Sequence, residues 1–405
     1  MRHSSDHILT SHVGSLPRPD ALIAANQARE TGATLDERAF QQTLSTAVSD
    51  VVRHQKELGI AVPGDGEFGK AMAQRVNYGS WWRYSWQRLS GIEPGQHSLY
   101  DMAPHRSSPG HIVLTSFGDR RDRANFSAAY NDPESGITTG SGARPPSPVC
   151  TGPLGYAGAE MIKTDIANFK AALAAAGVAE GFMTAVAPAS CARIDNTYYK
   201  SDEEFLYACA DAMREEYKAI VDAGIILQLD DPCIAEGWDQ VNPEPSVAEY
   251  QKLATIWIEA LNHAIRGLPP DRIRFHLCWG SWHGPHTTDI PMKDIVEVML
   301  KVNAGAYSFE AGNVRHEHEW RVWHDVKLPD DKILLPGVVS HATNVVEHPE
   351  LVADRIGRFA EIVGRERVIA STDCGLGGRI HPQIAWAKLE ALAQGAALAT
   401  KRLWR

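Results

Sequence analysis

Short apolar segments alternate with long amphipathic ones along almost the whole chain, and this alternation constrains the fold more than any other feature. Apolar residues that recur with a period of about 3.6 residues predict helices. The clearest predicted helices are Glu37–Leu58, Ile166–Ala175, Asp202–Ala223, Val247–Arg266, Met292–Val302, Pro349–Val363 and Gln383–Leu403. The predicted strands are Ile8–Ser15, Val62–Phe68, Val149–Leu154, Phe182–Pro188, Ile225–Asp230, Ile273–Trp279, Ala306–Ala311, Ile333–His341 and Val368–Cys374. Strands that alternate with helices indicate a parallel sheet with helical crossovers.

The chain has 405 residues, a length typical of a (β/α)8 TIM barrel with insertions. The strand candidates exceed by one the eight that such a barrel needs, so one of them is accessory. A doubly wound open sheet is the alternative, and the absence of a GxGxxG motif after the first predicted strand disfavours it. We therefore expect an α/β fold, with residues 1–405 forming a single catalytic barrel.

Residues from about 69 to 147 interrupt the alternation of predicted strands and helices. The segment is rich in aromatic and turn residues, among them Trp81, Trp82 and Trp86. It follows the second predicted strand, on the face where barrel enzymes carry their active sites. We expect an insertion that forms a lid or a pocket wall; a surface excursion or an oligomer contact is the alternative.

Composition excludes several classes of function. The formal net charge is −10, which argues against a nucleic-acid partner. No apolar run reaches the roughly 18 residues of a membrane helix, and Met1–His7 lacks the apolar core of a signal peptide, so we expect a cytoplasmic protein without membrane contacts. The six cysteines are widely scattered, unlike a disulfide framework.

Candidate metal ligands stand at the ends of three predicted strands. His276 and Cys278 are two residues apart in one strand, so their side chains point to the same side. Glu310 ends the next predicted strand and Cys374 the last one. An HxC pair alone is a weak signal, and a scattered cysteine is more often an inert buried one. The carboxyl ends of parallel strands meet, however, so the four side chains form a candidate site.

Thiolate, imidazole and carboxylate ligands together favour zinc. Ligand thiolates place negative charge on the metal, which fits the activation of a substrate thiol better than a hydrolytic zinc–water site. The chemical need is clear, because a free thiol has a pKa of about 8.5 and only the thiolate attacks.

These residues resemble a known family. From Thr10–Pro17 to about Leu392 the chain is similar to the C-terminal catalytic barrel of cobalamin-independent methionine synthase, in the superfamily that includes uroporphyrinogen decarboxylase. The resemblance rests on the HxC pair, the distant glutamate, and the Asp-Cys-Gly-Leu motif that contains Cys374. It implies a zinc site formed by His276, Cys278, Glu310 and Cys374.

The resemblance also implies substrate-binding residues. Ser15, in the Gly-Ser pair after the first strand, is similar to the segment that holds the carboxylate of homocysteine. Glu67 and Asp230 match the two carboxylates that hold its ammonium group. A buried carboxylate at a strand end can instead cap a helix, an alternative that is stronger for Asp231 than for Glu67 or Asp230.

His341 matches, with one gap, the family histidine that helps to protonate the leaving group. An imidazole has a pKa near neutrality and is apt for that role. A structural histidine at a strand end is the alternative. The histidines at positions 316 and 318 more naturally orient ligands from behind, or lie on the surface, than bind zinc directly. His283 and His286 follow the HxC pair and could line the pocket.

The folate-binding motifs of the family are altered. Pro145 and Pro146 follow Arg144, but Gly142 and Ala143 stand before it where the family has an Arg-Cys pair. The segment Thr184–Cys191 lacks the family's tryptophan. The thiol machinery is therefore retained, while the methyl donor stays open.

Three functions remain from sequence. The first is zinc-dependent methyl transfer to homocysteine or a similar thiol, from a methyl or alkyl donor. The second is alkylation of another thiol, such as epoxide opening by coenzyme M. The third, of a different class, is a non-catalytic zinc-stabilised barrel that binds a ligand, which predicts a closed four-ligand site. A homo-oligomer is possible in each case.

Overall fold

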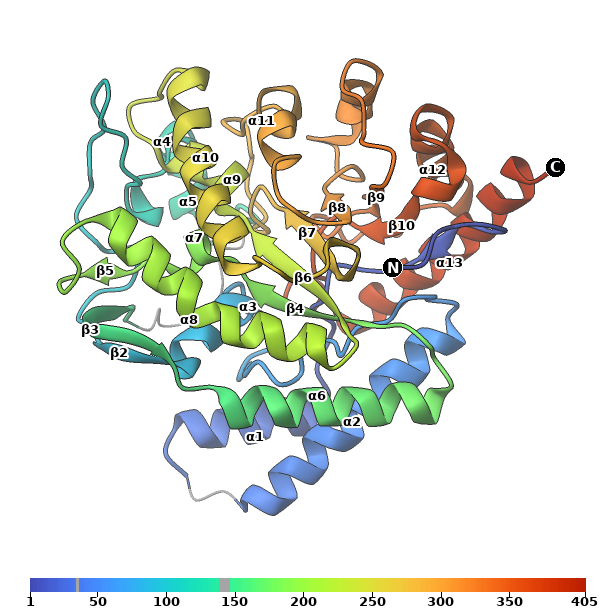
Figure 1. Cartoon of the computed structure of the whole chain (residues 1–405), viewed down its shortest axis with the longest axis horizontal. Coiled ribbons are helices and arrows are strands. Elements are labelled where there is room, and N and C mark those ends of the chain that lie inside the picture. Colours follow the sequence, from blue (N-terminus) through green and yellow to red (C-terminus); the bar gives the residue numbers. More distant parts are fainter. Residues whose placement is uncertain (34–35, 138–145) are drawn as a thin grey trace.

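A curled parallel sheet forms the centre of the molecule (Figure 1). The computed structural model describes residues 1–33, 36–137 and 146–405. The sheet has seven strands in the order β1-β10-β9-β8-β7-β6-β4, and every neighbouring pair is parallel. The strands are β1 (Leu9–Thr10), β4 (Phe182–Val186), β6 (Ile226–Asp231), β7 (Ile273–Leu277), β8 (Ala306–Phe309), β9 (Ile333–Val339) and β10 (Ile369–Thr372).

A short extended stretch at residues 61–64 joins the two edges of this sheet. The amides of Ala61 and Val62 donate to the Thr10 carbonyl oxygen of β1 at 3.1 and 3.0 Å. On the other side, Gly64 pairs in parallel with Phe182 of β4. The stretch fills the eighth strand position, which confirms the predicted (β/α)8 barrel.

The strands form because their residues are apolar and are covered on both faces. β4, β6, β7, β8, β9 and β10 are buried along their whole length, as expected of parallel strands inside a layer of helices. Polar groups inside the barrel bond to one another. The Arg274 guanidinium of β7 donates to Gln228 Oε1 at 2.7 Å and to the Ser11 hydroxyl at 2.8 Å.

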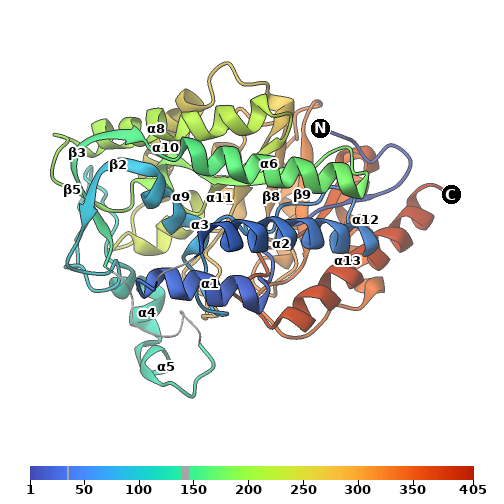
Figure 2. The ribbon, with the colours of Figure 1, turned by 90° about the horizontal axis from the view of Figure 1, so that it is seen from below.

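Long helices surround the sheet, and α2 and α6 lie side by side on one flank (Figure 2). The long helices are α1 (Asp20–Glu30), α2 (Glu37–Glu57), α6 (Ala159–Ala176), α8 (Asp202–Asp222), α10 (Val247–Ala264), α11 (Met292–Met299), α12 (Pro349–Val363) and α13 (Pro382–Leu403). Side chains cap several of their first turns: Ser201 accepts from the Glu204 amide, and Ser246 forms a capping box with Glu249. No helix in the described ranges is long and apolar enough to cross a membrane.

A second, three-stranded sheet lies beside the barrel, in the order β2-β3-β5. Its strands are β2 (Leu89–Pro94), β3 (Pro148–Tyr156) and β5 (Asp195–Asn196). β3 contains the predicted strand Val149–Leu154, which is therefore the accessory candidate outside the barrel. The short helices are α3 (Ser80–Arg83), α4 (Arg121–Asn125), α5 (Ser127–Asn131), α7 (Pro188–Cys191) and α9 (Cys233–Glu236), with 3-10 turns η1 (Tyr84–Arg88), η2 (Phe117–Asp119), η3 (Gly237–Gln240), η4 (Pro270–Arg272), η5 (Glu317–His324) and η6 (Arg365–Arg367).

Candidate metal and substrate site

Three of the predicted metal ligands lie together at the carboxyl ends of the barrel strands. His276 belongs to β7, Cys278 follows that strand directly, and Cys374 follows β10 by two residues. Their ligand atoms all lie within 4.8 Å of one another, and the two sulfur atoms are 3.8 Å apart. Both ring nitrogens of His276 are buried without a hydrogen-bond partner among the described residues. Buried polar groups are normally paired, so these orphaned nitrogens and two facing thiols fit a metal such as zinc.

The two thiols differ in acidity. A hydrogen bond from Cys278, together with the nearby imidazole of His276, holds the pKa of Cys374 well below its usual range. The same hydrogen bond, with burial, raises the pKa of Cys278 well above its usual range. A metal ion binds both sulfurs as thiolates, so its binding would release the proton of Cys278.

Glu310, the fourth predicted ligand, lies apart from these three. Its carboxylate accepts hydrogen bonds from the Trp279 amide at 2.9 Å and from Asn313 Nδ2 at 2.8 Å. It groups instead with His341 and Asp373, whose ligand atoms lie within 4.8 Å of it and of each other. Burial raises the pKa of Glu310 to about 8, so negative charge on this carboxyl is unfavourable in this arrangement.

Asp373 connects the ends of β8 and β10. Its Oδ1 accepts from the amides of Ala311 and Gly312 at 2.8 and 2.7 Å, and its Oδ2 accepts from Asn313 Nδ2 at 3.1 Å. The neighbours of Asp373 in sequence are Thr372 and Cys374. The aspartate therefore fixes the backbone after Glu310 relative to that of Cys374.

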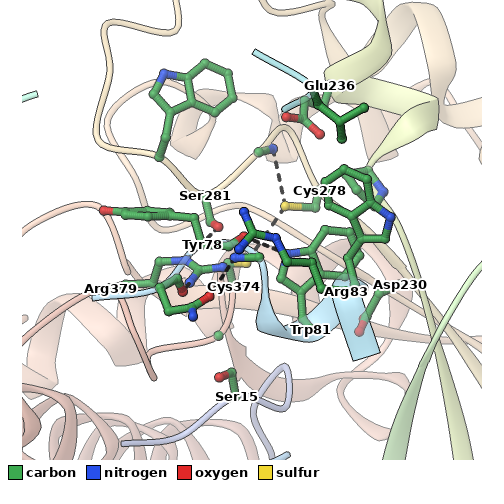
Figure 3. A pocket seen from close by; sticks show the side chains of 18 of the residues that line it. Ser15, Tyr78, Trp81, Arg83, Asp230, Glu236, Cys278, Ser281, Cys374 and Arg379 are labelled. Carbon is green, nitrogen blue, oxygen red and sulfur yellow. Dashed lines mark hydrogen bonds between the residues drawn. The ribbon is translucent and has the colours of Figure 1, made fainter. Parts of the chain in front are cut away.

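A cavity of about 320 Å³ opens onto the three metal-ligand candidates (Figure 3). Ser15, Glu67 and Asp230 line the same cavity as His276, Cys278 and Cys374. The structure thus brings together all three residues predicted to bind substrate. The lining of the cavity does not include Glu310 or His341.

Glu67 is buried and held in a strained backbone conformation, with φ of 63°. Its Oε1 accepts from the Thr184 hydroxyl at 2.6 Å and from Lys70 Nζ at 3.2 Å, while its Oε2 has no partner among the described residues. Arg18 lies behind, donating to the Ser15 hydroxyl at 2.9 Å. Glu67 therefore keeps one free oxygen, although Lys70 already offsets its charge.

Asp230 lies next to His276, because the two residues are paired across β6 and β7. Its Oδ1 accepts from Gln228 Nε2 at 2.7 Å, and burial raises its pKa to about 7. An ammonium group at Asp230 would favour the charged carboxylate and lower this pKa. The neighbouring Asp231 points elsewhere, accepting from the Ser190 hydroxyl at 2.8 Å.

Comparison with known proteins adds an independent observation to this geometry. The family profile described as "Cobalamin-independent synthase, Catalytic domain" matches residues 144–397. The chain belongs to this family.

Some relatives match this chain over nearly its whole length. The chain is 24% identical over 403 residues to a methionine synthase of Thermococcus kodakarensis, covering 98% of this chain and 94% of that one. It is 25% identical over 393 residues to the uncharacterized protein YxjH of Bacillus subtilis, covering 93% and 91% of the two chains. A solved B12-independent methionine synthase from Shewanella sp. W3-18-1 has the same fold, with a TM-score of 0.67 at 20% identity and coverage of 98% and 99%.

The aromatic segment after the second barrel strand forms part of the cavity wall. Tyr78, Trp81, Trp82 and Trp86 all line it, as the pocket-wall alternative predicts. Among the positions where the family's folate motifs are altered, Thr184 bonds to Glu67 as described above. Gly142, Ala143, Arg144 and Pro145 lie outside the described ranges.

Several cavity residues were not predicted from sequence. Arg120 and Arg193 both pair with Glu236, the second at 2.9 Å; all three line the cavity and have largely buried side chains. Arg379 lines the cavity next to the loop of Cys374. The three arginines come from loops and Glu236 ends the short helix α9, so their side-chain directions depend on distant contacts and no local sequence pattern marks them.

The histidine-rich loops form a second layer behind the cluster. His316 contacts Glu319 at 2.8 Å and Asp289 at 3.0 Å, and His286 contacts the same Asp289 at 3.0 Å. The carboxylates around His316 raise its pKa to about 10 against the effect of burial. The resulting positive charge acts on Glu310 and opposes the burial effect on its pKa. These histidines thus act on a predicted ligand from behind.

Proposed function

We propose that this protein is a zinc-dependent methyltransferase whose acceptor is the thiol of homocysteine. The observation that carries the proposal is the grouping of His276, Cys278 and Cys374 in one cavity with Ser15 and Asp230. Family membership and a full-length relative named methionine synthase support it.

Zinc would be held by His276, Cys278 and Cys374, and when bound it would lower the pKa of a substrate thiol so that the thiolate attacks the donor carbon. Glu310 can complete the set only by leaving its hydrogen bonds with Trp279 and Asn313. Because a carboxylate is the hardest of these donors, Glu310 would be the residue most readily left out of the set when a substrate thiol is present.

The chain's own residues would orient the amino acid. Asp230 and the free oxygen of Glu67 would accept hydrogen bonds from the ammonium group, and Ser15 would face the carboxylate. Holding the sulfur beside His276 in this way turns a bimolecular encounter into a positioned reaction, which contributes much of the rate enhancement.

His341 would assist the departing group of the donor. Burial lowers the pKa of His341 to about 3, so its imidazole is neutral near pH 7 and offers one N–H hydrogen bond. Its Nδ1 is buried without a partner in the described chain. We propose that His341 donates a hydrogen bond first, and transfers a proton only if negative charge develops beside it.

Alkylation of another thiol, such as epoxide opening by coenzyme M, remains the second candidate. The observation that favours it is the ion pair between Lys70 and Glu67 at 3.2 Å. This pair leaves less negative charge for a substrate ammonium group than two free carboxylates would.

We also propose that residues 1–405 act as one catalytic barrel, with about 69–147 inserted as the aromatic wall. The domain and the function are tested together by incubating the zinc-loaded full chain with homocysteine and a methyl donor. Methyltetrahydrofolate and S-methylmethionine are the donors to try first, with methionine detected by mass spectrometry. Methionine formed by the wild type and not by Cys278→Ser supports the proposal. Turnover of coenzyme M with an epoxide, and none of homocysteine, favours the second candidate.

A further inference from the structure

Arg379 is a buried cation that faces the cavity without a carboxylate partner. Its side chain belongs to the loop that follows Cys374 and is 7% exposed. No carboxylate of the described residues forms an ion pair with it; its bonding groups are the Ser281 hydroxyl and the Asn77 carbonyl oxygen. Burying a charge is costly unless an opposite charge or strong hydrogen bonds compensate it, so an anionic ligand at this position would stabilise the guanidinium.

The guanidinium is held firmly in place. Nε donates to Ser281 Oγ at 2.7 Å, Nη1 donates to the Asn77 carbonyl oxygen, and the group stacks 4.6 Å from the centre of the Tyr78 ring. The amide of Asn77 in turn donates to the carbonyl oxygen of Gly378 at 3.0 Å. These contacts leave Nη2 without a hydrogen bond in the described structure, so one edge of a preorganised fork remains for a ligand.

The loop that carries Arg379 also surrounds Ser15. The amides of Leu376 and Gly377 donate to the Ser15 carbonyl oxygen at 2.9 Å each, and the Ser15 hydroxyl donates to the Gly377 carbonyl oxygen at 3.3 Å. Arg379, Ser15 and Cys374 line the same cavity, as Figure 3 shows. An anion at Arg379 would therefore lie on the side of the cavity where Ser15 is expected to meet the substrate.

Each of the other cations near the cavity has the charge of a carboxylate nearby. Arg120 and Arg193 pair with Glu236. Lys70 pairs with Glu67 at 3.2 Å, and Arg83 has the charge of Glu30 beside it.

Arg18 is buried too, but its Nη atoms donate to Ser15 and to backbone carbonyl oxygens, and it does not line the cavity. Arg379 is thus the cation that best fits a bound anion.

We infer that Arg379 binds the anionic group of the acceptor thiol, which is the carboxylate of the amino acid. This inference rests on the proposed function and defines its substrate class: the acceptor carries an acidic group as well as a thiol. Arg379 and Ser15 take the carboxylate at one end of the molecule, while Asp230 takes the ammonium group near His276. A neutral or purely cationic thiol would leave the guanidinium unpaired.

The test compares two thiols on the zinc-loaded full chain by calorimetric titration. Homocysteine has the carboxylate; 3-aminopropane-1-thiol has the same thiol and ammonium group without it. Arg379→Gln should raise the dissociation constant of homocysteine by roughly 10- to 100-fold, the worth of a charge-assisted hydrogen bond, and leave that of 3-aminopropane-1-thiol within about twofold. Arg379→Lys, which keeps the charge, should fall between the wild type and Arg379→Gln.

Two controls separate binding from structure. Ser281→Ala removes a hydrogen bond to the guanidinium but keeps the charge of Arg379. It should therefore weaken the binding of homocysteine less than Arg379→Gln does. Zinc content should stay the same in all variants. If Arg379→Gln weakens the binding of both thiols equally, or does not weaken the binding of homocysteine, the inference is overturned and the proposed function stands. If the wild type binds neither thiol, the proposed function falls and the inference falls with it.

Discussion

At the scale of single residues, two sulfur atoms and an imidazole lie together at the floor of the cavity. The Cys278 and Cys374 thiols face each other at 3.8 Å, and His276 has no partner for either ring nitrogen within the described chain. The structure leaves Glu310 outside this group. The sequence pattern indicates which residue types end neighbouring strands, but the rotamer of Glu310 depends on Trp279 and Asn313, which no spacing reveals.

Cys278→Ser should abolish tight metal binding, because a serine hydroxyl is a poor zinc ligand at neutral pH. The loss of affinity should exceed the roughly 100-fold that removal of an outer-shell partner costs. Metal content after dialysis against a weak chelator measures it. Cys150→Ala is the matched control, since Cys150 is buried in β3 away from the cavity. Full zinc occupancy in Cys278→Ser, or equal loss in the control, would contradict the metal site.

His341→Ala should keep its zinc and slow the methyl transfer, by roughly 10- to 100-fold if the residue supplies one hydrogen bond to the leaving group. Single-turnover rates with preloaded homocysteine measure the chemical step directly. An unchanged rate would remove His341 from the reaction and assign it the structural role.

At the scale of elements, seven of the eight long helices are predicted because their signals are local, whereas α1, which has no side-chain cap, is not. Caps such as Asp36 and Ser246 stand directly before the helices that they begin. The position of each strand is harder to predict, because an apolar run has the same pattern in a barrel and in a side sheet. Val149–Leu154 pairs with β2 in the side sheet, a contact that depends on the path of the intervening chain. The second barrel strand has only one parallel bridge, at Gly64.

The short helices α4 and α5 are fastened to the loop after β7 by one buried carboxylate. Asp122 accepts from the Tyr130 hydroxyl at 2.8 Å and from the Thr287 amide at 2.9 Å. Tyr130 in turn accepts from Trp282 Nε1 at 2.7 Å, and Trp282 lines the cavity. The aspartate therefore couples this part of the wall to the loop that begins at Cys278.

Asp122→Ala should loosen that wall, because it leaves buried donors unpaired at a local cost of about 1–3 kcal/mol. Hydrogen–deuterium exchange of residues 121–131 should become roughly 10- to 100-fold faster, with zinc content unchanged. The control is Asp132→Ala, an exposed aspartate on the same segment. The coupling would be refuted by equal exchange in the two variants.

At the scale of the whole molecule, a chain of hydrogen-bonded polar side chains runs through the barrel interior and reaches the cavity. Arg274 binds Gln228, which donates to Asp230 in the cavity. His12 belongs to the same interior layer: its Nδ1 accepts from the Gly14 amide at 3.1 Å, and its Nε2 contacts Gln55 at 2.7 Å. Burial, and then the charge of Arg274, lower the pKa of His12 to about 3.

This buried neutral histidine makes the protein less stable in acid. Between its unfolded pKa of about 6.5 and its folded pKa of about 3, the unfolded chain binds one more proton than the folded chain, so the free energy of unfolding falls as pH falls. Relative to His12→Gln, the wild type should lose about 1.4 kcal/mol per pH unit between pH 5.5 and 4.5. Urea unfolding of both at equal zinc loading measures this, and parallel pH profiles would show that His12 does not titrate as described.

The central claim is that the cavity activates a thiol on a metal held by His276, Cys278 and Cys374. Zinc-edge X-ray absorption on the purified protein, before and after addition of homocysteine, tests it most directly. The account predicts two sulfur ligands before and three after, with one oxygen ligand lost as Glu310 or water leaves. A zinc shell that keeps two sulfurs in the presence of saturating homocysteine would contradict the account.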